Sequence, residues 1–370
     1  MPDQVINYKC PACTGPLHFG TQSGKLECDY CGSSYTLEEI EAMQSQKTQD
    51  AEIAFEEAEN APQEQWDLSQ AGSQWGEEEE KLRAYSCPQC GAELICEETT
   101  AATSCPYCGN PTVVPGQLSG SKKPDYIIPF AKTKEDALAA LKKHYSKKPI
   151  LPKAFQKDSH LQEVKGVYVP FWLFDAHVEA DMRFDATRSH SHTTADEIIT
   201  ETDHFLVHRA GSLDFEKIPV DGASKMPDTH MDAIEPYEYK DLKPFSLSYL
   251  PGFFADKYDV EKEESQKRAN LRCQRSTENA VRNTVLGYET CVTTGKNIRV
   301  HPKDVKYALL PVWLLSTQWN GKNYLFAMNG QTGKLVGDLP VSWGKFWGMF
   351  AGIAAILSIV GSIGAMLLMM

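Results

Sequence analysis

Eight cysteines give this chain its most specific chemistry, because they form four Cys-x-x-Cys pairs in two groups of two. In each group, fourteen residues separate the first pair from the second. The eight are Cys10, Cys13, Cys28, Cys31, Cys87, Cys90, Cys105 and Cys108. Four thiolates from two such pairs can surround one Zn²⁺ as a tetrahedron. The pattern therefore predicts two zinc ribbons that hold one ion each.

The predicted zinc ions are structural, because sulfur fills all four coordination positions and leaves none for a water molecule or a substrate. A ribbon of about forty residues buries too little apolar surface to fold unaided, and zinc can supply roughly 10 to 16 kcal/mol of apparent binding free energy. The alternatives are a disulfide framework or a redox-active dithiol, but the repeated spacing favours zinc. Cys96, Cys273 and Cys291 lack the paired spacing and are interpreted as buried or free thiols.

The charge of the ribbons argues against a nucleic-acid interface. Residues 1–37 and residues 81–120 each carry two basic and three acidic side chains, a net charge of −1. Neutralising a phosphate backbone requires clustered Lys and Arg, and nucleic-acid-binding domains are usually strongly basic. The ribbons are therefore expected to contact protein or to act as spacers.

The two ribbons occupy residues 1–37 and 81–118 of a 370-residue chain, a length that suggests two or three domains. Residues 38–80 join them and contain fourteen acidic side chains and one base, so this linker has a net charge of −13. Leu37 to Glu59 favours helix, and Pro62 to Gly76 has the composition of a flexible tether. The linker is interpreted as a solvated spacer, with docking of a basic partner as the alternative.

A duplicated α+β domain with antiparallel sheets is predicted for residues 121–342. Val164 and Pro170 are six residues apart, Val305 and Pro311 repeat that spacing, and a tryptophan follows each proline by two residues. Each copy is expected to contain a strand, a helix and two further strands.

The first copy is expected to begin with a strand at Tyr126 to Phe130. A helix then starts at Thr133 and stops before Pro149. In the second copy, Tyr249 to Pro251, together with Phe253 and Phe254, is the matching strand, and the charged residues 259–284 form the helix.

An insertion near residues 189–243 interrupts the first copy. Ile198 to Val220 alternates between apolar and polar residues, which predicts two strands joined near Gly211 and Ser212. The insertion contains histidines spaced two and four apart, but no acidic triad or cysteine completes a metal site, so they are interpreted as surface residues. They are His190, His192, His204 and His208.

No stretch carries an enzyme signature. Asn329 to Gly333 is a turn between apolar strands, with Asn329 and Gly330 expected at positive φ. It lacks the length and the hydroxyl residue of a phosphate-binding loop, and Walker, Rossmann, nucleophile-elbow and zinc-protease motifs are absent from the sequence. A non-enzymatic protein is therefore expected.

The C-terminal segment, residues 346–370, has no charged side chain. As a helix it reaches roughly 37 Å, more than the ~30 Å hydrocarbon core of a bilayer. Trp343 and Trp347 stand where interfacial anchors are found. A transmembrane helix is predicted, with a buried core helix as the alternative, and Gly348 with Gly352 permits close packing in a homodimer.

The distribution of positive charge predicts the orientation. Lys334 and Lys345 precede the span and no positive residue follows it, while the first residues do not resemble a signal peptide. The expectation is a single-pass protein of the cell membrane with the bulk of the chain in the cytoplasm, where reducing conditions preserve thiolates for zinc.

With the ribbons, the strand VPFWLF, the segment from Met328 to Pro340 and the apolar C-terminus, the chain resembles a bacterial family of membrane-anchored proteins that carry transcription-factor-IIB-type zinc ribbons. Members are often labelled as primosomal replication-restart helicases, whose ATPase motifs this sequence lacks. The resemblance implies an adaptor similar to those encoded beside phage-shock and flotillin-like proteins, which hold soluble partners at the membrane during envelope stress. It carries over the eight cysteines as zinc ligands and no catalytic residue.

The leading expectation is thus a non-enzymatic, membrane-tethered adaptor that recruits protein partners. The alternative is a nucleic-acid-binding or replication-restart-associated protein, an interpretation that rests on the ribbon type alone.

Overall fold

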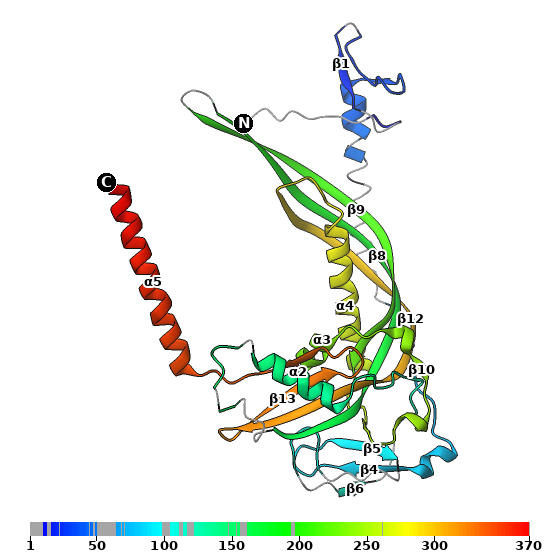
Figure 1. The fold of residues 1–370 in the computed structure, drawn as a ribbon. Coiled ribbons are helices and arrows are strands. Elements are labelled where there is room, and N and C mark those ends of the chain that lie inside the picture. Colours follow the sequence, from blue (N-terminus) through cyan, green and yellow to red (C-terminus); the bar gives the residue numbers. More distant parts are fainter. Residues whose placement is uncertain are drawn as a thin grey trace. The chain divides into compact units, whose positions relative to one another are not determined.

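The structure is a computed structural model that describes residues 10–12, 16–21, 23–43, 45–46, 49, 64–67, 69, 71–97, 104–110, 114–116, 122–146, 148–152, 154–155, 161–193, 197–260 and 262–369. These residues form two compact units, each considered by itself. Unit 1 is built from the described parts of Met1–Gln63, Ala180–Gly211 and Val281–Arg299, and unit 2 from those of Glu64–Glu179, Ser212–Ala280 and Val300–Met370. Four elements have residues in both units, namely β8 (Leu161–Thr193), β9 (Ile198–Asp221), α4 (Lys262–Arg282) and β12 (Thr290–Trp319) (Figure 1).

Unit 1 contains ribbon 1 and a small apolar core. The ribbon strands β1 (His18–Gly20), β2 (Lys25–Glu27) and β3 (Ser34–Tyr35) form an antiparallel sheet of their own. The separate core gathers alternate side chains of the long strands with Val281 of α4.

The acidic linker begins as a helix, as predicted. Residues 37–43 are helical, and a capping box precedes them. The Thr36 N–H donates to Glu39 Oε2 at 2.8 Å, and the Glu39 N–H donates to Thr36 Oγ1 at 3.2 Å. These bonds satisfy donors that a helix start leaves free. The predicted helix end, residues 50–63, lies outside the described residues. Most of the predicted tether, Pro62 to Gly76, is described and is not a free linker, because Trp66 is buried and its Nε1–H donates to Asn270 Oδ1 at 3.0 Å.

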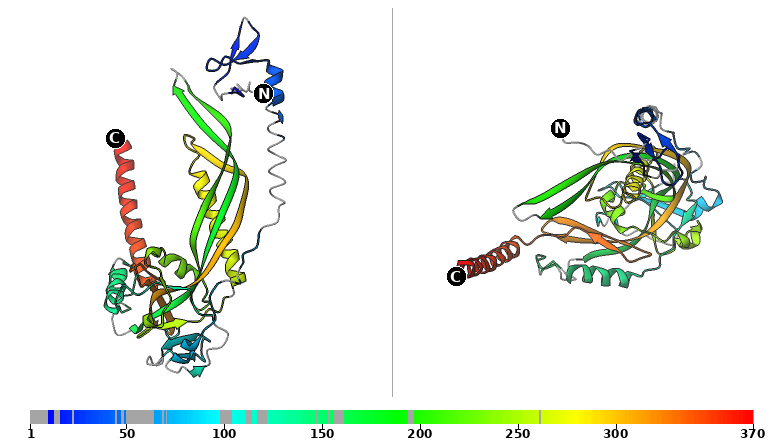
Figure 2. Two further views of the ribbon diagram at one scale, coloured as in Figure 1. Left: turned by 90° about the vertical axis from the view of Figure 1, so that its right-hand side faces the viewer. Right: turned by 90° about the horizontal axis from the view of Figure 1, so that it is seen from above.

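The main sheet has eleven strands. Its order is β10-β7-β12-β8-β11-β5-β4-β6, with β13 on β12, β14 on β13 and β9 on β8. The long green strands β8 and β9 run side by side in both views of Figure 2. The shorter strands are β4 (Leu82–Ser86), β5 (Glu93–Glu97), β6 (Val114–Gly116), β7 (Tyr126–Ile127), β10 (Lys243–Pro244), β11 (Phe254–Asp256), β13 (Lys322–Asn329) and β14 (Leu335–Gly337).

This sheet is mixed rather than antiparallel throughout. β7 runs parallel to β12, and β11 runs parallel to β8. The other strand pairs with a defined register, among them β4 with β5 and β12 with β13, are antiparallel. The expectation of purely antiparallel sheets was wrong because alternating side chains identify a strand but carry no information about the direction of its neighbour.

The insertion differs from its prediction in one respect. Ile198–Asp221 is one strand, β9, which pairs with β8, and the chain does not turn back at Gly211 and Ser212. Gly211 does not adopt a positive φ, and a Cβ placed there would have no neighbour within 4 Å. Glycine is typical of turns, but Gly211 lies in the extended backbone of a continuous strand.

The helices follow their predictions closely. α2 (Lys134–Ser146) starts with a capping box between Thr133 and Asp136 and buries Ala137, Leu141 and Tyr145, and α4 matches the predicted charged helix. α3 (Asp228–Ile234) was not predicted.

The strand predicted to begin at Tyr249 begins later in the structure. A 3-10 helix (Leu247–Tyr249) lies at the predicted start, and β11 begins at Phe254. Two more 3-10 helices span Glu77–Lys81 and Tyr239–Asp241.

The predicted turn at Asn329 to Gly333 is present. The Asn329 side-chain oxygen accepts from the N–H groups of Gln331 and Thr332, both at 2.9 Å. The positive φ is found at Gly333 (83°) and not at Asn329 or Gly330. Gly330 is required for a different reason, because a Cβ there would lie 2.7 Å from the Phe130 ring.

Two sets of contacts in unit 2 are alike. The Trp172 Nε1–H donates to the carbonyl of Val260 at 3.4 Å, two residues before α4 begins. The Trp313 Nε1–H donates to the carbonyl of Lys132 at 2.9 Å, two residues before α2 begins. The same agreement holds for backbone bonds, since Gly222 donates to Pro170 and Gly330 donates to Pro311.

The C-terminal helix α5 (Trp343–Met369) is long and apolar enough to cross a membrane. Its most apolar part, Trp343–Gly361, has a mean hydropathy of 1.5, and none of that part is buried. This stretch is therefore not a core helix of the described chain. Gly348 and Gly352 lie on the exposed helix with no neighbour within 4 Å, so their predicted role in a homodimer stays a prediction.

Candidate metal centre

Ribbon 2 positions its cysteines with two knuckles of the same geometry. In the first, the Gly91 N–H donates to the Cys87 carbonyl at 2.8 Å, and Gly91 has a φ of 71°. In the second, the Gly109 N–H donates to the Cys105 carbonyl at 3.0 Å, and Gly109 has a φ of 73°. A side chain at either glycine would be strained, since positive φ disfavours a Cβ. The motif that builds this site is therefore Cys-x-x-Cys-Gly.

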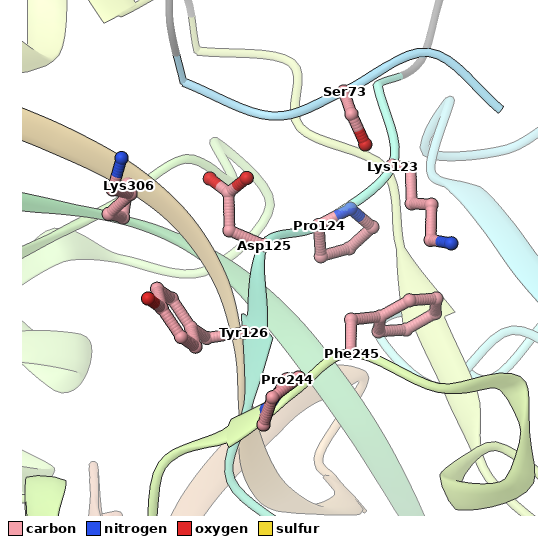
Figure 3. Close-up of a pocket in the computed structure, with 8 residues that line it drawn as sticks. All are labelled: Ser73, Lys123, Pro124, Asp125, Tyr126, Pro244, Phe245 and Lys306. Carbon is pink, nitrogen blue, oxygen red and sulfur yellow. The ribbon is translucent and has the colours of Figure 1, made fainter.

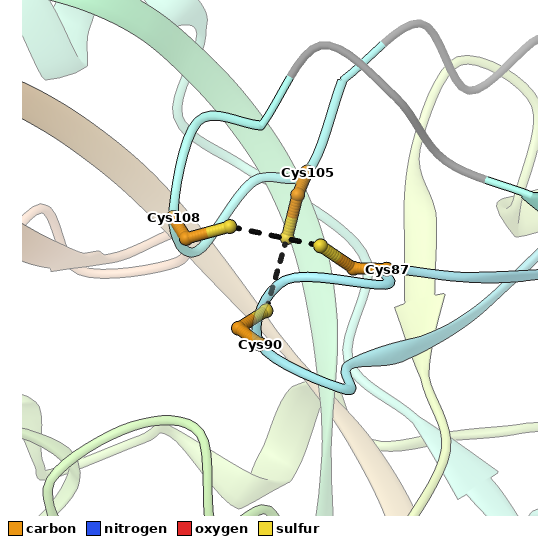
Figure 4. A group of neighbouring side chains, drawn as sticks. All are labelled: Cys87, Cys90, Cys105 and Cys108. Atoms are coloured by element: carbon orange, nitrogen blue, oxygen red, sulfur yellow. Dashed lines mark hydrogen bonds between the residues drawn. The ribbon is translucent and has the colours of Figure 1, made fainter.

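The two knuckles bring the four predicted thiols of ribbon 2 together. Their sulfur atoms all lie within 4.8 Å of one another, with Cys87 and Cys108 at 3.6 Å and Cys90 and Cys105 at 3.5 Å (Figure 4). In a tetrahedral site with Zn–S bonds of about 2.3 Å, neighbouring sulfurs are about 3.8 Å apart. The four thiols thus fit a metal ion of zinc size, and the sulfur donor set agrees with zinc.

The pKa values of the cluster cysteines also favour a bound cation. Burial alone raises the pKa of Cys87, but hydrogen bonds from the N–H groups of Cys90 and Gln89 outweigh it and bring the pKa to about 6. Burial raises the pKa of Cys90 to about 11 and raises that of Cys105 as well. Four thiolates cannot share this space without a positive ion, since each disfavours ionisation of the next.

Ribbon 2 is part of the main sheet. Strand β5 pairs with β11 through Ile95 with Ala255 and Leu94 with Asp256. Cys87 and Cys105 are buried in the core that also holds Leu94 and residues of β8 and β12. Because the ligands and the sheet share one core, the metal site and unit 2 depend on each other.

A buried hydrogen bond strengthens this connection. Tyr107 lies between the cysteines of the second knuckle, and its hydroxyl donates to Asp256 Oδ2 of β11 at 2.5 Å. Burial raises the pKa of Asp256 to about 8. The sequence analysis missed this pair, and no local signal could have found it, because 149 residues separate the two side chains.

Ribbon 1 has the same kind of knuckle in a different setting. The Gly32 N–H donates to the Cys28 carbonyl at 2.9 Å, and Gly32 has a φ of 73°. The sulfurs of Cys10, Cys28 and Cys31 lie within 4.8 Å of one another. The fourth predicted ligand, Cys13, lies outside the described residues. Three thiols of ribbon 1 therefore form a cluster that could hold a metal ion.

The three cysteines outside the knuckles belong to cores. Cys96 and Cys273 are fully buried, and Cys291 packs against the core of unit 1. Burial raises the pKa of both Cys96 and Cys273 to about 11, so these thiols stay protonated at neutral pH. Their interpretation as buried thiols agrees with this arrangement.

The histidines of the insertion do not gather into a metal site among the residues that the structure describes. His208 Nε2 contacts Asp181 Oδ1 at 2.6 Å, which is a pairwise contact on the surface of β8 and β9. The clusters suited to a metal in the described ranges are the two cysteine groups.

Unit 2 also has an open pocket of about 380 Å³, lined by Lys123, Asp125, Lys306 and neighbouring residues (Figure 3). Its charged groups are already bonded within the fold. Asp125 Oδ2 accepts from the N–H groups of Gly72 and Tyr307, and Lys306 pairs with Asp304 at 3.0 Å. Asp125 and Lys306 therefore contribute to holding together the segments that line this pocket.

Comparisons with known proteins place the chain in a family. No protein-family model matches the chain, and no solved structure matches it. A protein of Bacillus subtilis (strain 168), described as uncharacterized protein YdjG, is 36% identical over 352 residues. The match spans 95% of this chain and 94% of the relative. The chain therefore belongs to the same protein family as YdjG.

Proposed function

We propose that this protein is a non-enzymatic, membrane-tethered zinc-ribbon adaptor that holds protein partners at the cytoplasmic face of the cell membrane. The observation that carries the proposal is the cluster of Cys87, Cys90, Cys105 and Cys108, whose four sulfurs lie within 4.8 Å of one another and could fill all four positions of a tetrahedral zinc ion. An ion held in this way has no position for a substrate, so its contribution is to stability and shape.

The apolar helix α5 supports the membrane tether. None of its most apolar part is buried, and an exposed apolar surface of that length requires a partner such as the bilayer. Trp343 and Trp347 at its first turns suit the interface, and Lys345 beside them favours a cytoplasmic start. The adaptor would thus present its ribbons and sheet to cytoplasmic proteins.

We infer further that residues 121–342 arose by duplication. The two tryptophan bonds and the two glycine–proline bonds of unit 2 occur at matching positions in both halves, which supports this reading. The insertion would then end before Gly222, earlier than the predicted boundary near residue 243, because Gly222 takes part in the repeated contacts. A duplicated domain offers two similar surfaces and suits a scaffold.

The setting of the function is proposed from the family resemblance. Adaptors encoded beside phage-shock and flotillin-like proteins act during envelope stress, and the combination of ribbons with a C-terminal span is similar to theirs. Ribbon 1 and its acidic linker are the parts that we assign to partner recruitment.

The test is a capture experiment with the tagged full chain in bacterial membranes. We expect the full chain to stay in the membrane fraction after a carbonate wash, and a chain ending at Ser342 to become soluble. We expect at least one co-purified protein to be lost with Cys28→Ser, which unfolds ribbon 1 and leaves the main sheet intact. Cys291→Ser is the matched control and should retain the partner. Recovery of the same proteins with both variants would count against the proposal.

A second experiment addresses the alternative, a nucleic-acid-binding protein. Residues 1–342 are purified and tested for bound zinc and for binding to labelled duplex and single-stranded DNA at two salt concentrations. Two zinc ions without DNA binding agree with the adaptor. Tight binding that weakens with salt, and that Cys87→Ser abolishes, would replace the adaptor with a membrane-anchored nucleic-acid-binding protein.

A further inference from the structure

Residues 132–153 carry a charge opposite to that of the whole chain. Residues 132–153 contain seven lysines and two acidic residues, a net charge of +5 in a chain with a net charge of −13. The segment comprises α2 and the loop that follows it, and both acidic residues lie in the first turn of the helix. Positive charge is therefore concentrated at the C-terminal end of α2.

A pocket of about 310 Å³ opens at this end of α2. Its lining includes Lys143, His144 and Lys148, together with Gly333 and Leu335 from the turn before β14 and from that strand. The described residues that line the pocket include no carboxylate. The pKa of His144 is lowered, first by burial and then by the charge of Lys148. The positive potential of the pocket is therefore not cancelled by a carboxylate of the described lining.

The same segment holds the start of α5. The Ser342 N–H donates to the carbonyl of Ile150 at 2.9 Å, and Lys345 Nζ donates to the carbonyl of Leu151 at 2.6 Å. Lys148 is three residues before Leu151, so it lies within about 10 Å of this contact along the chain. The first turn of α5 is thus bonded to the loop that carries the pocket lysine.

The chain segment that joins β14 to α5 is also short. Five residues separate the end of β14 from Trp343, a span of at most about 18 Å. One of them, Leu339, packs against the core that contains Leu141 and Tyr145 of α2. If Trp343 marks the membrane interface, both walls of the pocket are within reach of the lipid headgroups.

We propose that this pocket binds the phosphate-bearing headgroup of an anionic phospholipid. The proposal rests on the proposed membrane tether, because α5 brings the pocket to the bilayer surface. Two ammonium groups suit a phosphodiester oxygen and its neighbouring anionic charge. At roughly 30 Å³ for each water molecule, the pocket holds the volume of about ten waters, enough for a phosphate with a glycerol substituent. Bound lipid would set the depth and orientation of the domain at the membrane.

The experiment measures lipid binding to the full chain in a non-ionic detergent by native mass spectrometry. The probes are phosphatidylglycerol, phosphatidylcholine and inorganic phosphate as a competitor. The pocket variant is Lys143→Gln with Lys148→Gln. The control variant, Lys240→Gln with Lys267→Gln, removes the same charge at exposed positions that do not line the pocket.

We expect phosphatidylglycerol to bind at least tenfold more tightly than phosphatidylcholine. Each lysine near an anionic lipid surface contributes roughly fivefold in affinity, so the pocket variant should lose about 30-fold and the control variant should match the unmodified chain. Equal binding of both lipids, or equal losses in the two variants, would overturn the proposal. Displacement by an equal concentration of inorganic phosphate would assign the pocket to a free anion instead.

The result is separable from the test of the tether. Lipid binding is measured in detergent solution and does not require α5 to be inserted in a membrane. A chain that washes off membranes yet binds phosphatidylglycerol selectively would end the adaptor proposal and keep the pocket assignment. A chain that stays in membranes without lipid selectivity would do the reverse.

Discussion

The two ribbons have the same cysteine spacing and differ in what surrounds their knuckles. Both carry a tyrosine at the third position of the second knuckle, Tyr30 in ribbon 1 and Tyr107 in ribbon 2. Tyr30 is 78% exposed, whereas Tyr107 is 7% exposed and bonded to Asp256. Ribbon 1 completes a three-stranded sheet of its own, whereas β5 of ribbon 2 continues into the main sheet through β11.

This comparison separates two uses of one metal motif. The knuckle geometry is local and is the same in both ribbons. How much of the fold a bound ion stabilises depends on the core around it. That core is small in ribbon 1 and is shared with the main sheet in ribbon 2. Removing the metal should therefore unfold a module in one case and weaken a domain in the other.

The largest expected effect is the difference in stability between a variant that lacks one cysteine ligand of ribbon 2 and a variant that lacks one of ribbon 1. We expect Cys87→Ser to destabilise unit 2 by about 5 kcal/mol or more, because a structural zinc supplies roughly 10 to 16 kcal/mol to its fold. For a domain of this size, that loss lowers the melting temperature by more than about 10 °C. Cys28→Ser should leave the main transition within about 1 °C. Scanning calorimetry of the full chain in detergent measures both, and equal shifts would mean that the ribbons are equally coupled.

The tyrosine pair gives the next largest effect. We expect Tyr107→Phe to lower the free energy of unfolding by about 2 kcal/mol, because Asp256 stays buried without its donor. Tyr30→Phe removes an exposed hydroxyl and should change the stability by less than about 0.5 kcal/mol. Urea unfolding followed by circular dichroism measures the difference. A Tyr107→Phe protein as stable as Tyr30→Phe would show that the buried bond does not couple ribbon 2 to the sheet.

A pH titration tests the same contact through Asp256. Its pKa of about 8 in the folded chain exceeds the value of roughly 4 in an unfolded chain, so the unfolded state loses this proton first as pH rises. The contribution to stability is complete below pH 4 and is lost as the pH rises towards 8. Between pH 6 and 8 we expect a loss of about 2 kcal/mol.

The matched variants for that titration are Asp256→Asn and Asp29→Asn. The first should flatten the decline in urea midpoint between pH 6 and 8. The second changes an exposed carboxyl of ribbon 1 and should leave the decline in place. A slope that survives Asp256→Asn would assign the pH dependence to other groups.

The smallest effect is expected at the helix that follows ribbon 1. Thr36→Ala removes the hydroxyl that caps residues 37–43 and should weaken that helix by about 1 kcal/mol. Hydrogen exchange should show roughly fivefold faster amide exchange in those residues, with no change in unit 2. Faster exchange in β5 or β11 would contradict the separation of the two ribbons.

The local features of this protein could be predicted from its sequence. The cysteine ligands could be predicted because each knuckle closes within five residues, from Cys87 to Gly91 for example, and needs no distant partner. The same is true of the capping box at Thr133 and of the turn at Asn329. The candidate span α5 was accessible because twenty-five residues without a charge exceed what a globular core requires.

The features that depend on distant residues could not be predicted. Tyr30 and Tyr107 have similar local surroundings, and the burial of Tyr107 depends on a carboxyl that is 149 residues away. The parallel direction of β7 and β11 depends on which strand each one meets, and alternation does not encode it. Gly211 shows the opposite error, in which a residue typical of turns lies in a continuous strand.

The contact between Tyr107 and Asp256 also affects the order of events during protein synthesis. A ribosome adds roughly 5 to 20 residues per second, so Asp256 emerges about 7 to 30 s after Tyr107. Throughout that interval all four cysteines of ribbon 2 exist, whereas β11, which carries Asp256, does not. A zinc ion can therefore reach the four thiols before the bond between Tyr107 and Asp256 joins the second knuckle to the main sheet. The order of translation allows metal binding to precede the docking of ribbon 2 on β11.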